Sequence, residues 1–320
     1  MSLSINNNAS ALVALETLNQ TQESLDSAQN AVATGKRVSS AADNPASYGI
    51  SAQINNDVSG QSAVNDGLSY ASQLVTTSLN AADSIVSTLN DVRNAVTDFT
   101  NKIGDKSSRD AITAKLTGLA GTINTIARNA TVKGTNLLSM STGDGYGIQT
   151  GNLSYLTGAQ GDMQTISGGY ALLQNNDSLS SGGMPSSVHI LTDALGLTTS
   201  ASAGENGTIG LDLANLITKA SLGTMNSADA NKLIDKISAA ITSMTNMTST
   251  LGSNKNTLAA MSSYGKNLQD SLTNASSSLV DADMAAESAK LTALQTKQSL
   301  GVKALTIANG QSQNILSLFQ

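Results

Sequence analysis

Apolar residues recur along the first half of the chain at an average spacing of 3.5 residues. This spacing is typical of helices whose apolar seam faces a partner helix. It continues over residues 50–99, where Ile50 and Asp57 are among the seam positions, and a shorter stretch follows over 112–130. In the first segment the seam positions are Ala11, Leu15, Leu18, Gln22, Leu25, Ala28 and Val32.

The second half of the chain repeats this pattern over residues 230–279 and again near the carboxyl end. The last run consists of Leu291, Leu294, Gln298, Gly301, Leu305, Ala308, Ser312, Ile315 and Phe319. Stripes of about fifty residues are too long for the core of one globular domain, since a helix over 50–99 alone would span roughly 80 Å. We therefore predict that both chain ends form a long antiparallel, coiled-coil-like helical rod.

Local chemistry predicts where these helices begin. Asp43 and Asn44 offer cap oxygens in front of Pro45, which suits the first helical turn. Gly104 separates two helical segments. The run 281–283, Asp-Ala-Asp, interrupts the carboxyl-terminal pattern and is expected to start the last helix.

Residues 134–226 lose the periodicity and contain 16 of the 27 glycines, six acidic residues and one basic residue. Short runs at 146–149 and 187–191 are typical of strands between turns. The fold class is therefore mostly α, with a small β-rich or mixed domain inserted in the middle. We expect three parts: terminal arms (1–40 with 282–320), a helical rod domain (41–133 with 227–281), and a Gly-rich, acidic, surface-exposed insertion (134–226).

Composition argues against an enzyme. The chain has no Cys and one His, so thiol nucleophiles and metal sites built from several imidazoles or thiolates are excluded. We interpret His189 as structural or exposed and residues 143–147 as a turn, because that run lacks the Lys of a phosphate loop and the spaced carboxylates of a calcium loop. No catalytic residue, cofactor site or metal site is expected.

The low charge, 12% of residues with a net charge of −6, makes nucleic acid an unsuitable partner, because phosphate binding needs clustered Lys and Arg. No apolar stretch has the length of a membrane span. The first residues also lack the basic start and apolar core of a secretory signal, so we expect no membrane insertion and no classical leader.

The two arms carry opposite charges. Residues 1–35 contain only Glu16, Glu23 and Asp26, and residues 288–320 contain only Lys290, Lys297 and Lys303. The residue numbers of Glu16 and Lys303, or of Glu23 and Lys297, add to nearly the same value, as they would in an antiparallel hairpin. Exposed pairs of this kind contribute at most about 1 kcal/mol, so they would select orientation. If they do not pair, the arms use another register or pair with neighbouring subunits.

The arms are also rich in Ser, Asn, Gln and Ala, and isolated helices are marginal without tertiary packing. We expect both ends to be largely disordered in the monomer and to fold when subunits assemble.

Four separated motifs resemble those of the bacterial flagellins, in the same order, and the resemblance covers both ends of the chain. The first residues, 3–8 (Leu-Ser-Ile-Asn-Asn-Asn), and the run 35–46 (GKRVSSAADNPA) are similar to the amino-terminal signatures. The runs 281–285 (DADMA) and 308–311 (ANGQ), the latter followed by LSLF, are similar to the carboxyl-terminal ones.

The resemblance implies a structural subunit that polymerises with itself into the flagellar filament for motility. Its arms would line the inner core, and the insertion would face outward. It also implies secretion through the flagellar type III export apparatus to the extracellular flagellum, with a flagellin chaperone and the filament cap as partners. The arm residues expected to support assembly are Leu15, Leu18, Leu25, Val32, Glu16, Glu23, Lys297, Lys303, Leu305, Ile315 and Phe319.

Two alternatives stay open: a hook-filament junction protein, or a specialised flagellin-like surface protein whose insertion binds a ligand such as polysaccharide. The chain departs from the family pattern at Thr248 and Thr257, which flank Leu251-Gly252 where Arg residues are usual, and at Ser278. In family members sensed by the flagellin-recognising Toll-like receptor, the long helix carries an Arg-rich patch. Here the equivalent helix keeps Arg93 but has Asp91 where a base is expected and Asn94 where an acid is usual.

Overall fold

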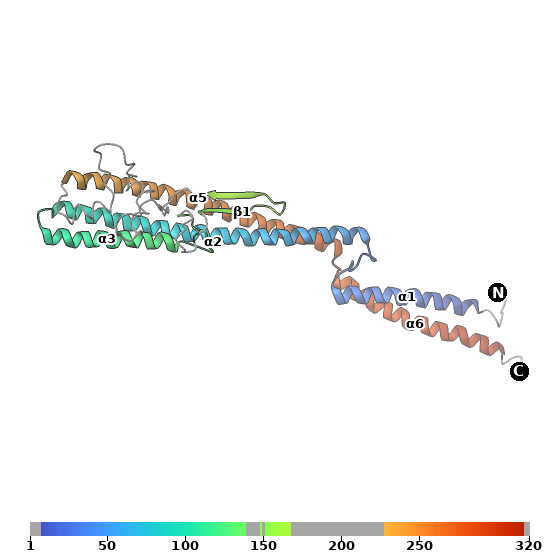
Figure 1. Ribbon diagram of the computed structural model, residues 1–320. Helices are drawn as coiled ribbons and strands as arrows, with labels where there is room; N and C mark the ends of the chain where they lie inside the picture. Colours follow the sequence, from blue (N-terminus) through green and yellow to red (C-terminus); the bar gives the residue numbers. More distant parts are fainter. Residues whose placement is uncertain (1–7, 139–147, 149–150, 168–226, 317–320) are drawn as a thin grey trace. The chain divides into compact units, whose positions relative to one another are not determined.

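The described residues are mostly helical and include one small β-hairpin, which confirms the predicted fold class (Figure 1). The computed structural model describes residues 8–138, 148, 151–167 and 227–316. In chain order the elements are α1 (Ala9–Thr34), α2 (Pro45–Asn101), α3 (Lys106–Asn129), β1 (Asn152–Leu156), β2 (Met163–Ser167), α5 (Ser227–Val280) and α6 (Met284–Leu316).

The chain forms two compact units. The arm unit comprises Met1–Gly60 and Asn267–Gln320, and the central unit comprises Gln61–Lys266. The long helices α2 and α5 each contribute one stretch to each unit. The expected division into arms, rod and insertion describes positions within a filament. It stays a prediction.

The central unit is built around a long apolar core shared by α2, α3 and α5. Every predicted seam position of α2 from Gln61 to Phe99 is buried. On α3, Leu116 and Ile123 are buried, and on α5 the predicted seam is buried at Leu233, Ile237, Ala240, Met244, Met247, Leu251 and Leu258. The 3.5-residue spacing therefore identified the buried face of all three helices in this unit.

The hairpin belongs to the same core. Strands β1 and β2 pair antiparallel, with Asn152 opposite Ser167 and Leu156 opposite Met163. Leu153, Tyr155 and Ile166 are buried with the helical residues. This hairpin confirms that the middle of the chain contains β-structure, although the strands expected at 146–149 and 187–191 lie outside the described residues, apart from the buried Ile148.

The starts of α2 and α6 follow the predicted caps, and α3 starts at a cap that the sequence analysis did not identify. The side-chain oxygen of Asn44 accepts a hydrogen bond from the backbone N–H of Ser47 at 3.1 Å, and Pro45 is the first residue of α2. Asp283 accepts from the N–H groups of Ala285 and Ala286 at the start of α6. Asp105 caps α3 by accepting from the N–H of Ser108, so α3 begins at a carboxylate directly after Gly104.

The central unit also contains a polar pair inside its helical seam. Gln61 and Asn65 on α2 are 3% and 8% exposed, and the Gln61 amide donates to the Asn65 side-chain oxygen at 3.3 Å. Gly265 of α5 lies against this pair. A Cβ at Gly265 would collide with the Asn65 oxygen and lie 2.8 Å from the Gln61 nitrogen, so glycine here admits two amide side chains between the helices.

We expect Gly265→Ala to destabilise the central unit by about 1 kcal/mol or more, because the added methyl displaces a buried amide pair. Without that collision, an alanine inside a helix would stabilise by about 0.5–1 kcal/mol. Gly252→Ala is the matched control, since Gly252 is on the same helix and a Cβ there has no neighbour within 4 Å.

Thermal and denaturant unfolding of the full chain measures both variants. Adding Asn65→Ala to Gly265→Ala should recover part of the loss because it removes the colliding oxygen. A Gly265→Ala protein as stable as the Gly252→Ala protein would contradict this account.

Candidate assembly surface of the terminal arms

The two arms pair with each other through a narrow seam. Helices α1 and α6 run antiparallel and side by side within the arm unit (Figure 1). The Asn8 amide donates to the Ala308 carbonyl at 2.9 Å, and the Gln298 amide donates to the Gln22 side-chain oxygen at 2.6 Å. Between them, the Leu18 methyl lies 3.3 Å from the position that a Cβ would take at Gly301. These contacts define one antiparallel register.

The predicted seam of α6 matches its buried face, whereas that of α1 is partly wrong. The predicted positions Leu291, Leu294, Gln298, Gly301, Leu305 and Ala308 are all covered or half-covered, as are Glu287 and Gly310. On α1, Leu18, Leu25, Ala28 and Val32 are covered or half-covered, but Leu15 is 44% exposed and Gln22 is exposed. Ala14 and Thr21 take their places in the seam.

The error has a physical reason. Apolar residues occur on all sides of the first turns of α1, so hydrophobicity alone could not decide whether Ala14 or Leu15 faces α6. The same one-residue error occurs at the start of α2, where Ser51 is buried and Ile50 is 50% exposed. Ile315 lies in α6 without a described side chain, and Phe319 lies outside the described residues.

Backbone hydrogen bonds tie the two arms together where they leave the long helices. Arg37 and Val38 donate their N–H groups to the Val280 carbonyl at 2.7 and 3.2 Å, and Ala282 donates to the Gly35 carbonyl at 2.9 Å. The Arg37 guanidinium donates to the Leu279 carbonyl. Gly35 ends α1 in the left-handed conformation, φ +70°, which glycine adopts at little cost.

A second polar cluster lies in the segments of α2 and α5 that belong to the arm unit. The hydroxyls of Ser51 and Ser276 share a hydrogen bond of 3.0 Å, and the Ser276 hydroxyl also reaches the Asn55 side-chain oxygen at 3.0 Å. Both serines are buried. The heptad analysis did not find this cluster, because it searched for apolar positions.

The turn between α1 and α2 is organised by one carboxylate. Asp43 accepts hydrogen bonds from the N–H and hydroxyl groups of both Ser39 and Ser40, at 2.9 to 3.1 Å. These bonds, first among them the one from the Ser40 backbone, lower the pKa of the Asp43 carboxyl below its ordinary value of 3.8. Sequence reasoning read Asp43 only as a helix cap.

We expect this turn to loosen in acid. Because the folded state lowers the pKa of Asp43, its stabilising contribution is complete above about pH 3.8, shrinks below it, and disappears once the pH passes the lowered pKa. Amide hydrogen exchange at Ser39 and Ser40 should therefore accelerate in this range.

Asp43→Asn should show the faster exchange already at neutral pH. Asp57→Asn, at an exposed carboxylate of the same unit, should leave exchange at Ser39 and Ser40 unchanged. Equal exchange in wild type and Asp43→Asn at neutral pH would refute this role of the carboxylate.

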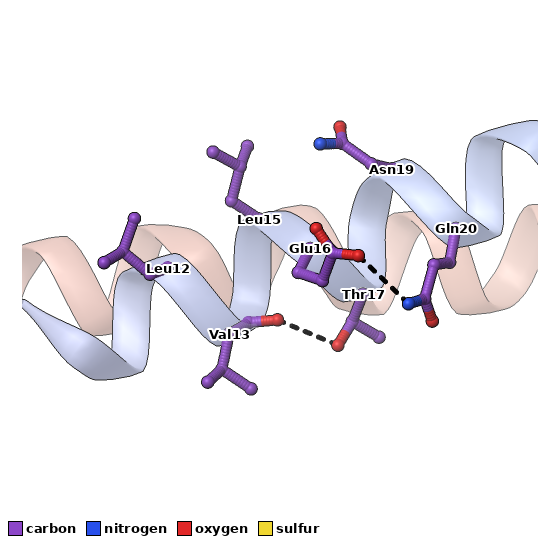
Figure 2. Close-up of a pocket in the computed structure, with 7 residues that line it drawn as sticks. All are labelled: Leu12, Val13, Leu15, Glu16, Thr17, Asn19 and Gln20. Atoms are coloured by element: carbon purple, nitrogen blue, oxygen red, sulfur yellow. Dashed lines mark hydrogen bonds between the residues drawn. The ribbon is translucent and has the colours of Figure 1, made fainter.

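The opposite charges of the arms do not pair within the chain. Among the described residues, the arm unit contains one ion pair, Lys290 with Glu287 at 3.2 Å on the same helix. Glu16 instead accepts from the Gln20 amide, as Figure 2 shows. The register predicted from the charges agrees with that of the helix contacts, but Glu16 is roughly 160° around the helix from Leu18 and therefore points away from α6.

Most of the large apolar side chains that are exposed belong to the arm unit. They occur twelve times in the described residues, and nine of them are in this unit: Leu12, Val13, Leu15, Tyr48, Ile50, Met284, Leu300, Val302 and Ile307. Leu12, Val13 and Leu15 line an open hollow on α1 together with Glu16, Thr17, Asn19 and Gln20 (Figure 2). Exposed apolar surface of this kind is typical of a surface that another protein covers.

The residues expected to face a receptor lie on α2 in the central unit. Asp91 and Asn94 are exposed, and Arg93 is half-buried between the seam positions Val92 and Val96. They are therefore on the outer side of the helix, available to a partner.

Chemistry-bearing clusters are absent from the described part of the chain. It contains no group of three or more His, Asp or Glu residues arranged to hold a metal. None of its helices is both long and apolar enough to cross a lipid bilayer. His189 and residues 143–147 lie outside the described residues.

Long paired helices that leave large apolar side chains exposed are typical of a structural subunit that assembles with other proteins. Comparisons with known proteins identify the family. Residues 5–142 match the bacterial flagellin N-terminal helical region, and residues 234–319 match the bacterial flagellin C-terminal helical region. The chain belongs to the bacterial flagellin family, a structural protein family, and is a subunit of the flagellar filament.

Curated flagellins match along nearly the whole chain. The chain is 32% identical to a flagellin of Brucella melitensis over 318 residues, 99% of both chains. It is 32% identical to flagellin FljM of Caulobacter vibrioides over 99% of its own length and 98% of the relative. It is 30% identical to flagellin C of Rhizobium meliloti over 99% of both. The alternative functions considered from the sequence are not favoured by these matches.

Proposed function

We propose that the chain has no enzymatic role and polymerises through its arm unit, with residues 1–40 and 282–320 as the inner core of the filament. In this arrangement residues 41–133 and 227–281 form the surrounding helical layer, and residues 134–226 face the surroundings. The observation that carries the proposal is the concentration of exposed apolar side chains on the arm unit, nine of twelve in the described residues. A monomer leaves these side chains in water, and a polymer buries them.

The proposed route to the filament is secretion by the flagellar type III export apparatus, with a flagellin chaperone and the filament cap as partners. It rests on the membership of the family and on the motifs at both ends of the chain. The extracellular flagellum is the proposed location. Disorder of the arms in the monomer stays a prediction; in the structure both arms are helical and paired.

Deleting residues 1–35 or 288–320 should abolish polymerisation and leave the rest of the chain folded. The central unit has its own continuous core, which neither deletion touches. Sedimentation and negative-stain microscopy under conditions that polymerise the full chain measure filament formation, and circular dichroism checks the remaining helix. Filaments from either truncated chain would contradict the proposal.

Monomer should activate the flagellin-recognising Toll-like receptor weakly or not at all. Asp91 carries the opposite charge to the one that the family resemblance leads us to expect, and Asn94 lacks the expected negative charge. Both changes should weaken binding to the receptor, because mismatched charges are costly at a desolvated contact. The variant Asp91→Arg with Asn94→Glu should raise the response about tenfold or more in a reporter-cell assay. Asp83→Arg, an exposed charge reversal on the same helix, is the control. A strong response to wild-type monomer would refute this prediction.

A further inference from the structure

Two outward stripes of residues lie on the arm unit, one on each helix. The acidic stripe of α1 consists of Leu12, Glu16, Asn19 and Glu23, and the basic stripe of α6 consists of Thr296, Leu300, Lys303 and Ile307. All eight residues are exposed. Leu12 is 58% exposed, Leu300 60% and Ile307 67%. Both stripes follow the same spacing of four, three and four residues, which keeps each on one side of its helix.

Both stripes face away from the seam that joins α1 to α6. Glu16 precedes Leu18 by two positions, and Lys303 precedes Leu305 by two, which places each charge roughly 160° around its helix from the seam residue. The carboxylates of Glu16 and Glu23 and the ammonium groups of Lys297 and Lys303 form no ion pair in the described part of the chain. The attraction between the arms of one chain is therefore left to apolar and amide contacts.

The stripes match each other at two of their four positions, one apolar and one charged. Placed antiparallel, Leu12 lies opposite Ile307, Glu16 opposite Lys303, and Asn19 opposite Leu300; the two residue numbers of each pair add to 319. Glu23 then lies opposite Thr296, and Lys297 is the next residue of α6, about 100° around the helix. Two subunits that point the same way present α1 of one copy antiparallel to α6 of the other, as this match requires.

We propose that the acidic stripe of one copy docks on the basic stripe of a second copy of the same chain, with Glu16 and Glu23 facing Lys303 and Lys297. The inference rests on the proposed polymerisation through the arm unit and names the surfaces that carry one of its contacts. The occupant is a second copy because each copy offers one acidic and one basic face, and Leu12 and Glu16 of one copy match Ile307 and Lys303 of the next in the same register.

The contact is heterologous. A closed two-fold dimer would have to make the acid-to-base contact twice between the same two copies. The two stripes face opposite sides of the α1–α6 pair, so one neighbouring copy cannot cover both. When two copies dock acid to base, one acidic and one basic stripe remain free at the ends of the pair. A third copy can therefore bind in the same way as the second. The contact thus propagates and does not close at a dimer.

Two charge-reversed full-length chains test this pairing. Variant A carries Glu16→Lys and Glu23→Lys, and variant B carries Lys297→Glu and Lys303→Glu. Each variant alone presents like charges on both stripes, so its critical concentration for polymerisation should rise about tenfold over wild type. An equimolar mixture should polymerise near the wild-type concentration, because A and B alternate with every pair restored.

A third chain with all four substitutions should polymerise by itself, whether the charges pair within a chain or between chains. The mixture separates these two cases, since pairing within a chain cannot be restored by a second molecule. A mixture that polymerises no better than A or B alone, while wild type forms filaments, overturns the docking proposal and leaves the proposed function standing. Absence of filaments from wild type would instead refute the proposed function.

Circular dichroism establishes that A and B keep the helix content of wild type. If either is unfolded, Glu16→Gln with Glu23→Gln replaces variant A, and Lys297→Gln with Lys303→Gln replaces variant B. Each neutral variant should raise the critical concentration and flatten its dependence on salt between low and physiological ionic strength, because the screened attraction is removed. An unchanged critical concentration and salt dependence would overturn the proposal.

Discussion

The close approach of α1 and α6 is the interaction on which the arm unit depends. Leu18 packs against the backbone at Gly301, and the flanking bonds from Asn8 to Ala308 and from Gln298 to Gln22 hold the register. Most other seam positions of α1 are Ala or Thr. A seam of small residues brings two helices close together but removes little apolar surface from water, in proportion to its area. Pairing within the chain therefore covers one side of each helix, and several large apolar residues, among them Leu12, Leu300 and Ile307, remain exposed.

The central unit instead buries its large apolar side chains within the chain. Leu68, Leu74, Ile85, Leu89 and Phe99 of α2 are buried completely with residues of α3 and α5. Such a core stabilises the unit without a partner, which is why truncating the arms is not expected to unfold it. The contrast between the two units follows from which seam positions carry large side chains and which carry small ones, and it supports the proposal that the chain associates through the arms.

The sequence was sufficient to predict the helices, their caps and most of the buried faces. It succeeded where large apolar residues alternate with clearly polar ones, as between Gln61 and Phe99, and at Asn44 and Asp283, where the chemistry of capping is local. It failed where the buried position is small or polar. Ser51 and Ser276 are covered while Ile50 is exposed, because hydrogen bonds satisfy the two hydroxyls and the surface of an assembling unit keeps apolar residues outside. Hydrophobicity alone assigns such positions to the wrong face.

The charge pattern predicts how the two arm helices are aligned, but not which way the charged side chains point. The constant sum of Glu16 with Lys303 and of Glu23 with Lys297 predicts the antiparallel register, and the contacts at Leu18 and Gln22 have nearly the same sums. Yet a register describes positions along two helices and not directions around them. Once the seam is placed, Glu16, Glu23 and Lys303 turn out to point away from it, and the described part of the chain offers them no ion-pair partner. In the proposed docking, the next molecule in the same orientation satisfies these charges, and a contact that every added copy leaves open extends into a polymer.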